Sequence, residues 1–275
     1  MFRKNLKKTF IYAILIFFSL LFLAPFFWLL TTSVKGPEEV FLFPPKWIPT
    51  TWHFENFMKA WNLQPFNLFL KNSLIVVVLS TIGQVFSSSL VAFGFARFEF
   101  RGRNFLFLIV LATMMIPWDV TMIPLYMQFN FLGWINTLKP LIVPSYFGSA
   151  FFIFLLRQFL MGIPKDLDEA ARIDGANAFQ IYWKIYLPLM KPALVLISVF
   201  NILGTWNDYL GPLIFLNDQR KYTLSLGLSQ FKGMNGVDTT SMMAITTLIC
   251  LPPLIMFFLA QKHIIDGVSS TGLKG

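Results

Sequence analysis

The sequence predicts an all-α membrane protein with six transmembrane helices. Of its 275 residues, 56% are hydrophobic and only 13% are charged, whereas about a quarter of the residues in a soluble domain are charged. The mean hydropathy is +0.65, and the few charges leave long uncharged stretches. The core of a soluble fold is too small to hide this much apolar surface, so we expect lipid to surround most of the chain.

The N-terminal part predicts a cytoplasmic segment over residues 1–10 and a first transmembrane helix over residues 11–33. Basic side chains crowd the first eight positions, and no charge follows between Lys8 and Lys35. This apolar run is longer than that of a signal peptide and lacks an Ala-x-Ala-like cleavage site, so we expect an uncleaved helix.

Residues 34–70 predict an outer loop. This segment is rich in proline and tryptophan: Pro37, Pro44, Pro45, Trp47, Pro49, Trp52, Trp61 and Pro65. The prolines exclude a long regular helix, and aromatic side chains suit the membrane interface.

Five further helices are predicted within a core over residues 71–261, because nearly uncharged stretches long enough for about 20 residues per helix follow one another there. With the first helix, the predicted centres lie near Leu21, Ser80, Met115, Ala150, Asn201 and Cys250. The fourth and fifth helices are short or interrupted by polar residues. Residues 217–238 form a polar outer loop, and residues 262–275 form a cytoplasmic tail.

The distribution of basic residues predicts the orientation. Six helices place both termini on one side, and the segments on that side hold most of the 22 Lys and Arg. The other side holds only Lys35, Lys46, Lys59, Lys71, Lys139, Arg220, Lys221 and Lys232. The positive-inside rule then puts both termini in the cytoplasm. The net charge of +9 therefore reflects the orientation of the chain in the membrane. Nucleic-acid binding is not indicated, because the sequence has no long basic run interleaved with aromatic residues.

The third helix carries two prolines and an acid. Pro117 and Pro124 each remove a backbone hydrogen bond, which predicts kinks or breaks. Asp119 lies between them. An acid in hydrocarbon usually faces the bundle interior or a watery cavity, which makes Asp119 a candidate for the substrate pathway. The alternative is that the helix ends early and Asp119 lies in the outer interface.

The fifth helix contains the polar run Trp206, Asn207, Asp208 and Tyr209. Amides and carboxylates bind sugar hydroxyls, and aromatic rings pack against the C–H face of a sugar. These four residues are therefore candidates for the substrate pathway. The alternative is that they bond to neighbouring helices and hold the bundle together.

The predicted cytoplasmic segment from Gly162 to Pro192 differs most from its surroundings. Pro164 suits the start of a helix, and Asp166, Asp168 and Glu169 complement the positive end of its dipole. Gly175 permits the positive φ that ends this helix, so a short helix is predicted over about residues 164–175. A second helix follows with one aromatic stripe, ending at Pro188. That stripe comprises Phe179, Tyr182, Trp183 and Tyr186.

Two short helices at a glycine bend predict a compact cytoplasmic knob that fits a groove on another protein. An amphipathic loop lying on the membrane is the alternative.

The run Glu169-Ala170-Ala171-x-x-Asp174-Gly175-Ala176, followed by Leu187-Pro188, resembles the EAA signature of ABC importer permeases. The chain from about Asn72 onward resembles the carbohydrate-uptake branch, specifically the smaller permease of the maltose-type heterodimer. Supporting stretches are residues 96–103, 123–126, 155–159, 206–209 and 272–275.

The resemblance implies a type I ABC importer (MetI-like) permease fold in which a cytoplasmic coupling helix docks into an ATPase subunit. It implies this contact for Asp168, Glu169, Ala170, Ala171, Asp174, Gly175 and Ala176, and for Lys274 and Gly275 of the tail. The implied partners are a second homologous permease subunit, two ATP-binding cassette subunits, an extracytoplasmic solute-binding protein and membrane lipid. ATP and Mg²⁺ would be bound by the partner ATPase, and this chain would bind no cofactor. It implies a carbohydrate substrate and the cell membrane of a bacterium or archaeon.

Other function classes fit the sequence less well. No G-x-x-x-x-G-K-[ST] phosphate loop, H-E-x-x-H zinc motif or serine elbow occurs, so an ATPase or membrane enzyme is not predicted. The single cysteine, Cys250, excludes an internal disulfide framework. An ion-coupled secondary transporter would have Asp119 and Asp208 as its only intramembrane acids and would leave the knob unexplained. A permease for a polyol or glycerol phosphate remains an alternative.

Overall fold

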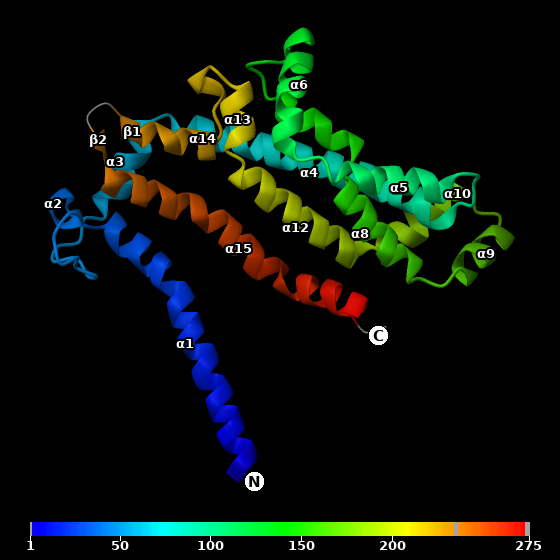
Figure 1. Cartoon of the computed structure of the whole chain (residues 1–275), viewed down its shortest axis with the longest axis horizontal. Helices are drawn as coiled ribbons and strands as arrows, with labels where there is room; N and C mark the ends of the chain where they lie inside the picture. The colour runs from blue at the N-terminus through cyan, green and yellow to red at the C-terminus, as the bar shows by residue number, and fades with distance from the viewer. Residues whose placement is uncertain (1, 234–235, 273–275) are drawn as a thin grey trace. The chain divides into compact units, whose positions relative to one another are not determined.

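The computed structural model describes residues 2–233 and 236–272 and is almost entirely helical (Figure 1). The elements are α1 (Phe2–Ser33), α2 (Pro37–Val40), α3 (Glu55–Leu63), α4 (Phe66–Arg97), α5 (Arg103–Thr113), α6 (Trp118–Phe131), α7 (Lys139–Ile142), η1 (Val143–Phe147), α8 (Ala150–Met161), α9 (Asp166–Ile173), α10 (Ala178–Ile181), η2 (Tyr182–Tyr186), α11 (Leu187–Leu189), α12 (Lys191–Asn207), α13 (Leu210–Phe215), η3 (Gln219–Lys221), α14 (Leu224–Leu228), η4 (Ser229–Phe231), β1 (Lys232–Gly233), β2 (Gly236–Val237) and α15 (Thr239–Gly272).

The helices match the six predicted spans. Four are long and apolar enough to cross a membrane on their own: Lys7–Ser33, Phe66–Arg97, Lys139–Met161 and Thr239–Gln261. Two more spans arise if each sharply bent pair counts as one: α5 with α6, bent by 94°, and the run Ala178–Leu189 with α12, bent by 75°. The prediction of an all-α membrane protein is confirmed, with one two-stranded antiparallel hairpin, β1–β2, in the outer loop.

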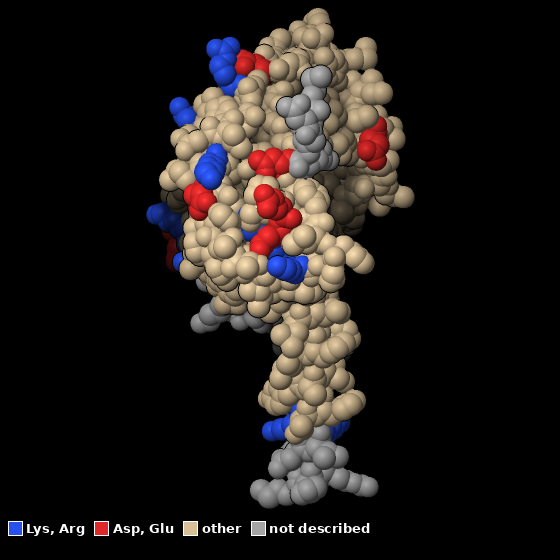
Figure 2. All heavy atoms as spheres, turned by 90° about the vertical axis from the view of Figure 1, so that its left-hand side faces the viewer, with Lys and Arg blue, Asp and Glu red and all other residues tan. Residues whose placement is uncertain are grey.

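The chain divides into two compact units, Met1–Phe66 with Leu228–Pro252, and Asn67–Gly227 with Pro253–Gly275. In the first unit, α1 is apolar on all sides. Within Lys7–Ser33, an 18-residue window has a mean hydropathy of 2.6 and none of it is buried inside the chain, whereas Thr31, Thr32 and Ser33 at the end of the helix are buried. In Figure 2 the middle of this helix carries no charged side chains. A helix that exposes apolar side chains all round requires a lipid environment.

The outer loop of the first unit folds back on the end of α1. Lys35 is fully buried, and its ammonium donates to the Lys46 carbonyl at 2.6 Å and lies 4.0 Å from the Trp28 ring. Asn56 Nδ2 donates to the carbonyls of Ser33 and Lys35 at 3.1 and 2.9 Å. As the prolines predict, the helices here are short: α2 has 4 residues and α3 has 9.

The second unit is built around α4, which has α5, α8 and α12 packed alongside it (Figure 1). The helix begins at Phe66, five positions before the predicted start of the core. The buried cluster of this unit is Ala92, Phe93, Ala96, Phe107, Phe152, Ile153, Leu156, Leu160, Ala171, Ile181, Tyr182, Tyr186, Met190, Ala193 and Ile197. It includes residues of α9 and η2, so the helices of the predicted knob pack directly against transmembrane helices.

Polar side chains also join these helices. Asn201 of α12 donates to Thr81 Oγ1 of α4 at 2.9 Å, and Ser89 of α4 pairs with the Tyr182 hydroxyl at 2.8 Å. Hydrogen bonds between membrane helices satisfy polar groups that lipid cannot.

Candidate functional site

The predicted knob is a helix–turn–helix structure whose first helix, α9, begins at Asp166. Asp166, Asp168 and Glu169 lie in its first turn, where carboxylates interact favourably with the helix dipole. Glu169 and Ala170 are exposed, and Ile173 at the end of the helix is 85% exposed. These side chains are available to a partner.

The opposite face of α9 packs against the body of the chain. Ala171 is buried, and the Asp168 side chain is only 13% exposed and lies 3.6 Å from Arg97. The resemblance implies an ATPase contact for both residues, but residues three apart share one helix face. Because that face packs inward, neither Asp168 nor Ala171 is presented on the surface of the knob.

The bend after α9 is a Schellman motif. The N–H groups of Gly175 and Ala176 donate to the carbonyls of Arg172 and Ala171 at 3.0 and 2.9 Å. Gly175 has φ +81°, the left-handed conformation that this motif requires and that glycine adopts without strain. Asp174, also in the predicted set, is exposed at the end of the helix.

The second helix of the knob starts with a capping box. Asn177 Oδ1 accepts from the Gln180 N–H at 2.9 Å, and Gln180 Oε1 accepts from the Asn177 N–H at 2.8 Å. The sequence interpretation missed this cap, although Asn-x-x-Gln before an apolar run is its signature. The two caps on either side of Gly175 hold the bend in one geometry.

The predicted single aromatic stripe is wrong. Tyr182 and Tyr186 are buried in the core, whereas Phe179 and Trp183 are 65% and 51% exposed and stack with centroids 6.1 Å apart. The chain forms a π-helix over η2, whose i→i+5 bonds place more residues in each turn. Residues four apart still share a face, but residues three apart no longer do, so the pair Tyr182 and Tyr186 separates from the pair Phe179 and Trp183.

The helical run ends at Leu189, one residue beyond the predicted stop at Pro188, and the 75° bend follows there. Helical turns precede Pro188 without a gap, so its missing N–H removes one backbone bond to the preceding turn.

The first of the predicted proline breaks occurs as expected. Pro117 is the N-cap of α6, and the 94° bend between α5 and α6 falls at this point. By contrast, α6 runs without interruption through Pro124. Asp119 lies in the first turn of α6 and is exposed on the surface of this chain, so it is not enclosed within the second unit.

The four polar residues of the fifth span do not form a buried cluster. α12 ends at Asn207, which is exposed, while Trp206 is buried and Tyr209 is 39% exposed. Asp208 Oδ1 accepts from the Gly211 N–H at 3.1 Å and so caps α13. Within this chain Asn207 is therefore exposed and Asp208 half-buried, and they do not lie in one buried cluster with Trp206 and Tyr209.

The chain matches, over residues 84–270, the family described as binding-protein-dependent transport system inner membrane component. The chain belongs to this family. The match includes the whole knob and the third to sixth spans. Lys274 and Gly275, the predicted tail contacts, lie outside the described residues.

Individual relatives of this permease match over most of their length. It is 34% identical to the arabinooligosaccharides transport system permease protein AraQ of Bacillus subtilis, covering 94% of this chain and 92% of the relative. It is 32% identical to the diacetylchitobiose uptake system permease protein NgcG of Streptomyces coelicolor, covering 94% and 86%. A crystal structure of a bacterial ABC transporter that imports alginate shares the fold, with a TM-score of 0.82, 24% identity and coverage of 92% and 95%.

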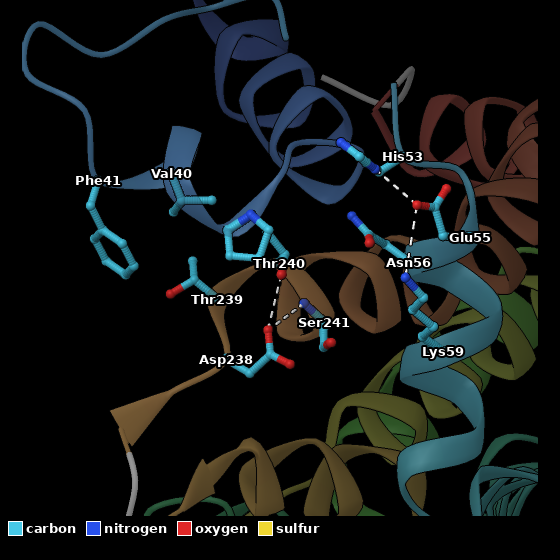
Figure 3. A pocket seen from close by; sticks show the side chains of 11 residues that line it. Val40, Phe41, His53, Glu55, Asn56, Lys59, Asp238, Thr239, Thr240 and Ser241 are labelled. Atoms are coloured by element: carbon cyan, nitrogen blue, oxygen red, sulfur yellow. Dashed lines mark hydrogen bonds and ion pairs between the residues drawn. The ribbon is translucent and has the colours of Figure 1, made fainter. Parts of the chain in front are cut away.

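The first unit of the permease contains a cavity of about 610 Å³ between the outer loop and the start of α15. In Figure 3, His53, Glu55 and Lys59 line one side, and Val40 and Phe41 lie opposite. His53 Nδ1 donates to Glu55 at 2.8 Å, and this hydrogen bond holds the pKa of Glu55 below its usual value. Asp238 caps α15 through Thr240 and Ser241. Glu55 is therefore already paired with His53 and Lys59, and Asp238 is already hydrogen-bonded within the first turn of α15.

Proposed function

We propose that this permease is one of two membrane-spanning subunits of an ATP-driven importer of oligosaccharides. The proposal for the substrate class draws on the two relatives named for arabinooligosaccharides and diacetylchitobiose, each of which aligns with nearly the whole chain. A second homologous permease would complete the pathway, and an extracytoplasmic solute-binding protein would deliver the sugar. Both termini would lie in the cytoplasm of a bacterium or archaeon, since most Lys and Arg lie on that side.

The observation that carries the coupling role is the exposed outer face of α9 next to a doubly capped bend. Glu169, Ala170 and Asp174 project from it, while its inner face packs on transmembrane helices. A rigid helix in this position can dock into an ATP-binding cassette subunit and transmit its movement to the membrane helices. ATP and Mg²⁺ would be bound by that ATPase, and this chain would bind no cofactor.

The pathway would be lined by polar side chains that this chain leaves exposed. Asp119, Asn207 and Tyr209 are exposed at interrupted helices, and polar groups in a bilayer are favourable where they face water or substrate. Trp206 and Asp208 would support this surface from behind, since one is buried and the other caps α13.

The test is uptake by the complete transporter, reconstituted in proteoliposomes with its own partner subunits and solute-binding protein. We expect ATP-dependent uptake of a labelled oligosaccharide that persists when ionophores collapse the ion gradients. Uptake of only a polyol or glycerol phosphate would replace the sugar assignment. Uptake driven by an ion gradient without ATP would refute the proposal as a whole.

A further inference from the structure

Arg97, the last residue of α4, is a cation that is buried near the end of a membrane helix. Its side chain is 3% exposed, although arginine is among the residues least often buried. In the sequence, Arg97 belongs only to the stretch 96–103 that resembles the permease family, and no local pattern predicts a role for it. A buried charge must be matched by partners that repay its lost hydration, so its contacts indicate what it does.

Arg97 contacts three other elements. Its Nη2 donates to the Leu160 carbonyl at 2.6 Å and the Ile163 carbonyl at 2.9 Å, at and just beyond the end of α8. The last carbonyls of a helix have no partner within the helix, and a cation there also complements the dipole. On its other side, Nη1 lies 3.6 Å from Asp168 Oδ2 of α9. The guanidinium also lies 4.5 Å from the centroid of the Tyr186 ring.

We propose that Arg97 and Asp168 form the joint through which the coupling helix α9 moves the transmembrane helices. One planar guanidinium ties α9 to α4, to the end of α8 and to η2 at the same time, which a point charge such as lysine cannot do. Arg97 and Asp168 are thus positioning residues: their side chains are largely buried within this chain, and they fix the orientation of the face that carries Glu169. The inference rests on the proposed coupling role of α9.

The joint is incompletely hydrogen-bonded. Among the described residues, Arg97 Nε, Asp168 Oδ1 and the Tyr186 hydroxyl are buried with no hydrogen bond of good geometry, although Asp168 and Tyr186 do interact. Unsatisfied buried polar atoms are rare in folded proteins, and here two donors and one acceptor occur together. The 3.6 Å separation of Arg97 and Asp168 therefore leaves an ion pair rather than a direct hydrogen bond between α4 and α9.

A second ion pair links the same two chain segments and serves as a matched control. Lys165 and Glu99 are 3.1 Å apart, but their side chains are 65% and 78% exposed. Exposed pairs contribute little because water screens them. If removing the Glu99 charge leaves transport unchanged, an effect of removing Asp168 or Arg97 is specific to the buried ion pair and does not arise from any loss of charge between α4 and α9.

The experiment compares Asp168→Asn, Arg97→Gln and the control Glu99→Gln in the complete reconstituted transporter. For the two joint variants we expect the sugar transported per ATP hydrolysed to fall by about tenfold or more, while the ATPase subunits still copurify. Glu99→Gln is expected to match the wild type. Asp168→Asn is nearly isosteric, so it decides the test if Arg97→Gln fails to insert into the membrane.

A distance measurement separates positioning from a general loss of stability. After Cys250→Ser, spin labels at the exposed positions Ile173 of α9 and Phe105 of α5 report the orientation of α9. We expect a broadened distance distribution in Asp168→Asn and an unchanged one in Glu99→Gln. An unchanged distribution and an unchanged transport-to-ATP ratio in both joint variants would overturn the proposal. Absence of ATP-driven uptake by the wild type would instead refute the proposed function.

Discussion

Replacing Gly175 tests whether the bend after α9 depends on the left-handed backbone conformation of this residue, because an added side chain would contact nothing in the chain. Gly175 has φ +81°, and a Cβ added there would meet no atom within 4 Å. The penalty within this chain is therefore conformational only, about 1–2 kcal/mol for an L-residue in the left-handed region. A penalty of that size lowers the population of the native bend by about 5- to 30-fold. Because the bend orients α9, uptake should fall while membrane insertion is preserved.

The conformational penalty of the positive φ should increase through the series Gly175→Asn, Gly175→Ala and Gly175→Val. Asparagine tolerates the left-handed region best and a β-branched residue tolerates it worst, so transport per inserted molecule should decrease in that order, with Val abolishing uptake. Gly133→Val is the matched control, since Gly133 has φ +67° and equally open surroundings but lies far along the chain from α9. The measurements are ATP-dependent uptake in proteoliposomes and the amount of inserted protein by immunoblot. Normal uptake by Gly175→Val, or equal losses in Asn and Val, would refute the reasoning.

Four further variants test other positions in the chain. Glu169→Arg reverses an exposed charge on α9, so uptake should be lost while insertion survives; normal ATP-dependent uptake would contradict the docking surface. Asp208→Ala removes the cap of α13, which costs about 0.5–2 kcal/mol. It should change sugar transport without releasing the ATPase, and an unchanged rate and sugar preference would leave only a capping role. Gly83→Ala would place a Cβ 2.5 Å from the Tyr146 ring and should lower the unfolding free energy by about 1–3 kcal/mol. Gly94→Ala meets no atom within 4 Å and should raise it by up to about 1 kcal/mol, as thermal denaturation in detergent can show.

The six spans could be predicted because hydropathy is a property of each stretch by itself. A charge within an apolar run is costly in lipid whatever lies beside it, so the gaps between charges marked the helices. The break at Pro117 was equally local, since a missing N–H affects its own helix. At Pro124 the same signal was misleading, because α6 accommodates the proline without interruption.

The faces of the helices could not be predicted with the same success. α9 has an apolar side in its sequence, but nothing local indicates that Asp168 points inward with Ala171. That direction depends on Arg97, which is 71 positions earlier in the sequence and is brought close only by packing. The separation of Tyr182 and Tyr186 from Phe179 and Trp183 likewise depends on the π-helix, for which the sequence carries no simple signal.

The sequence by itself determined that this chain is a membrane protein of six spans with an exposed helix–glycine–helix knob. Those features follow from lipid solubility and from caps such as Gly175, which act over a few residues. Only the tertiary structure decided that one face of α9 is free for a partner while the other is tied through Arg97 to α4 and α8. A buried charge is stable only where distant segments supply its partners together, and that arrangement exists only in the folded chain.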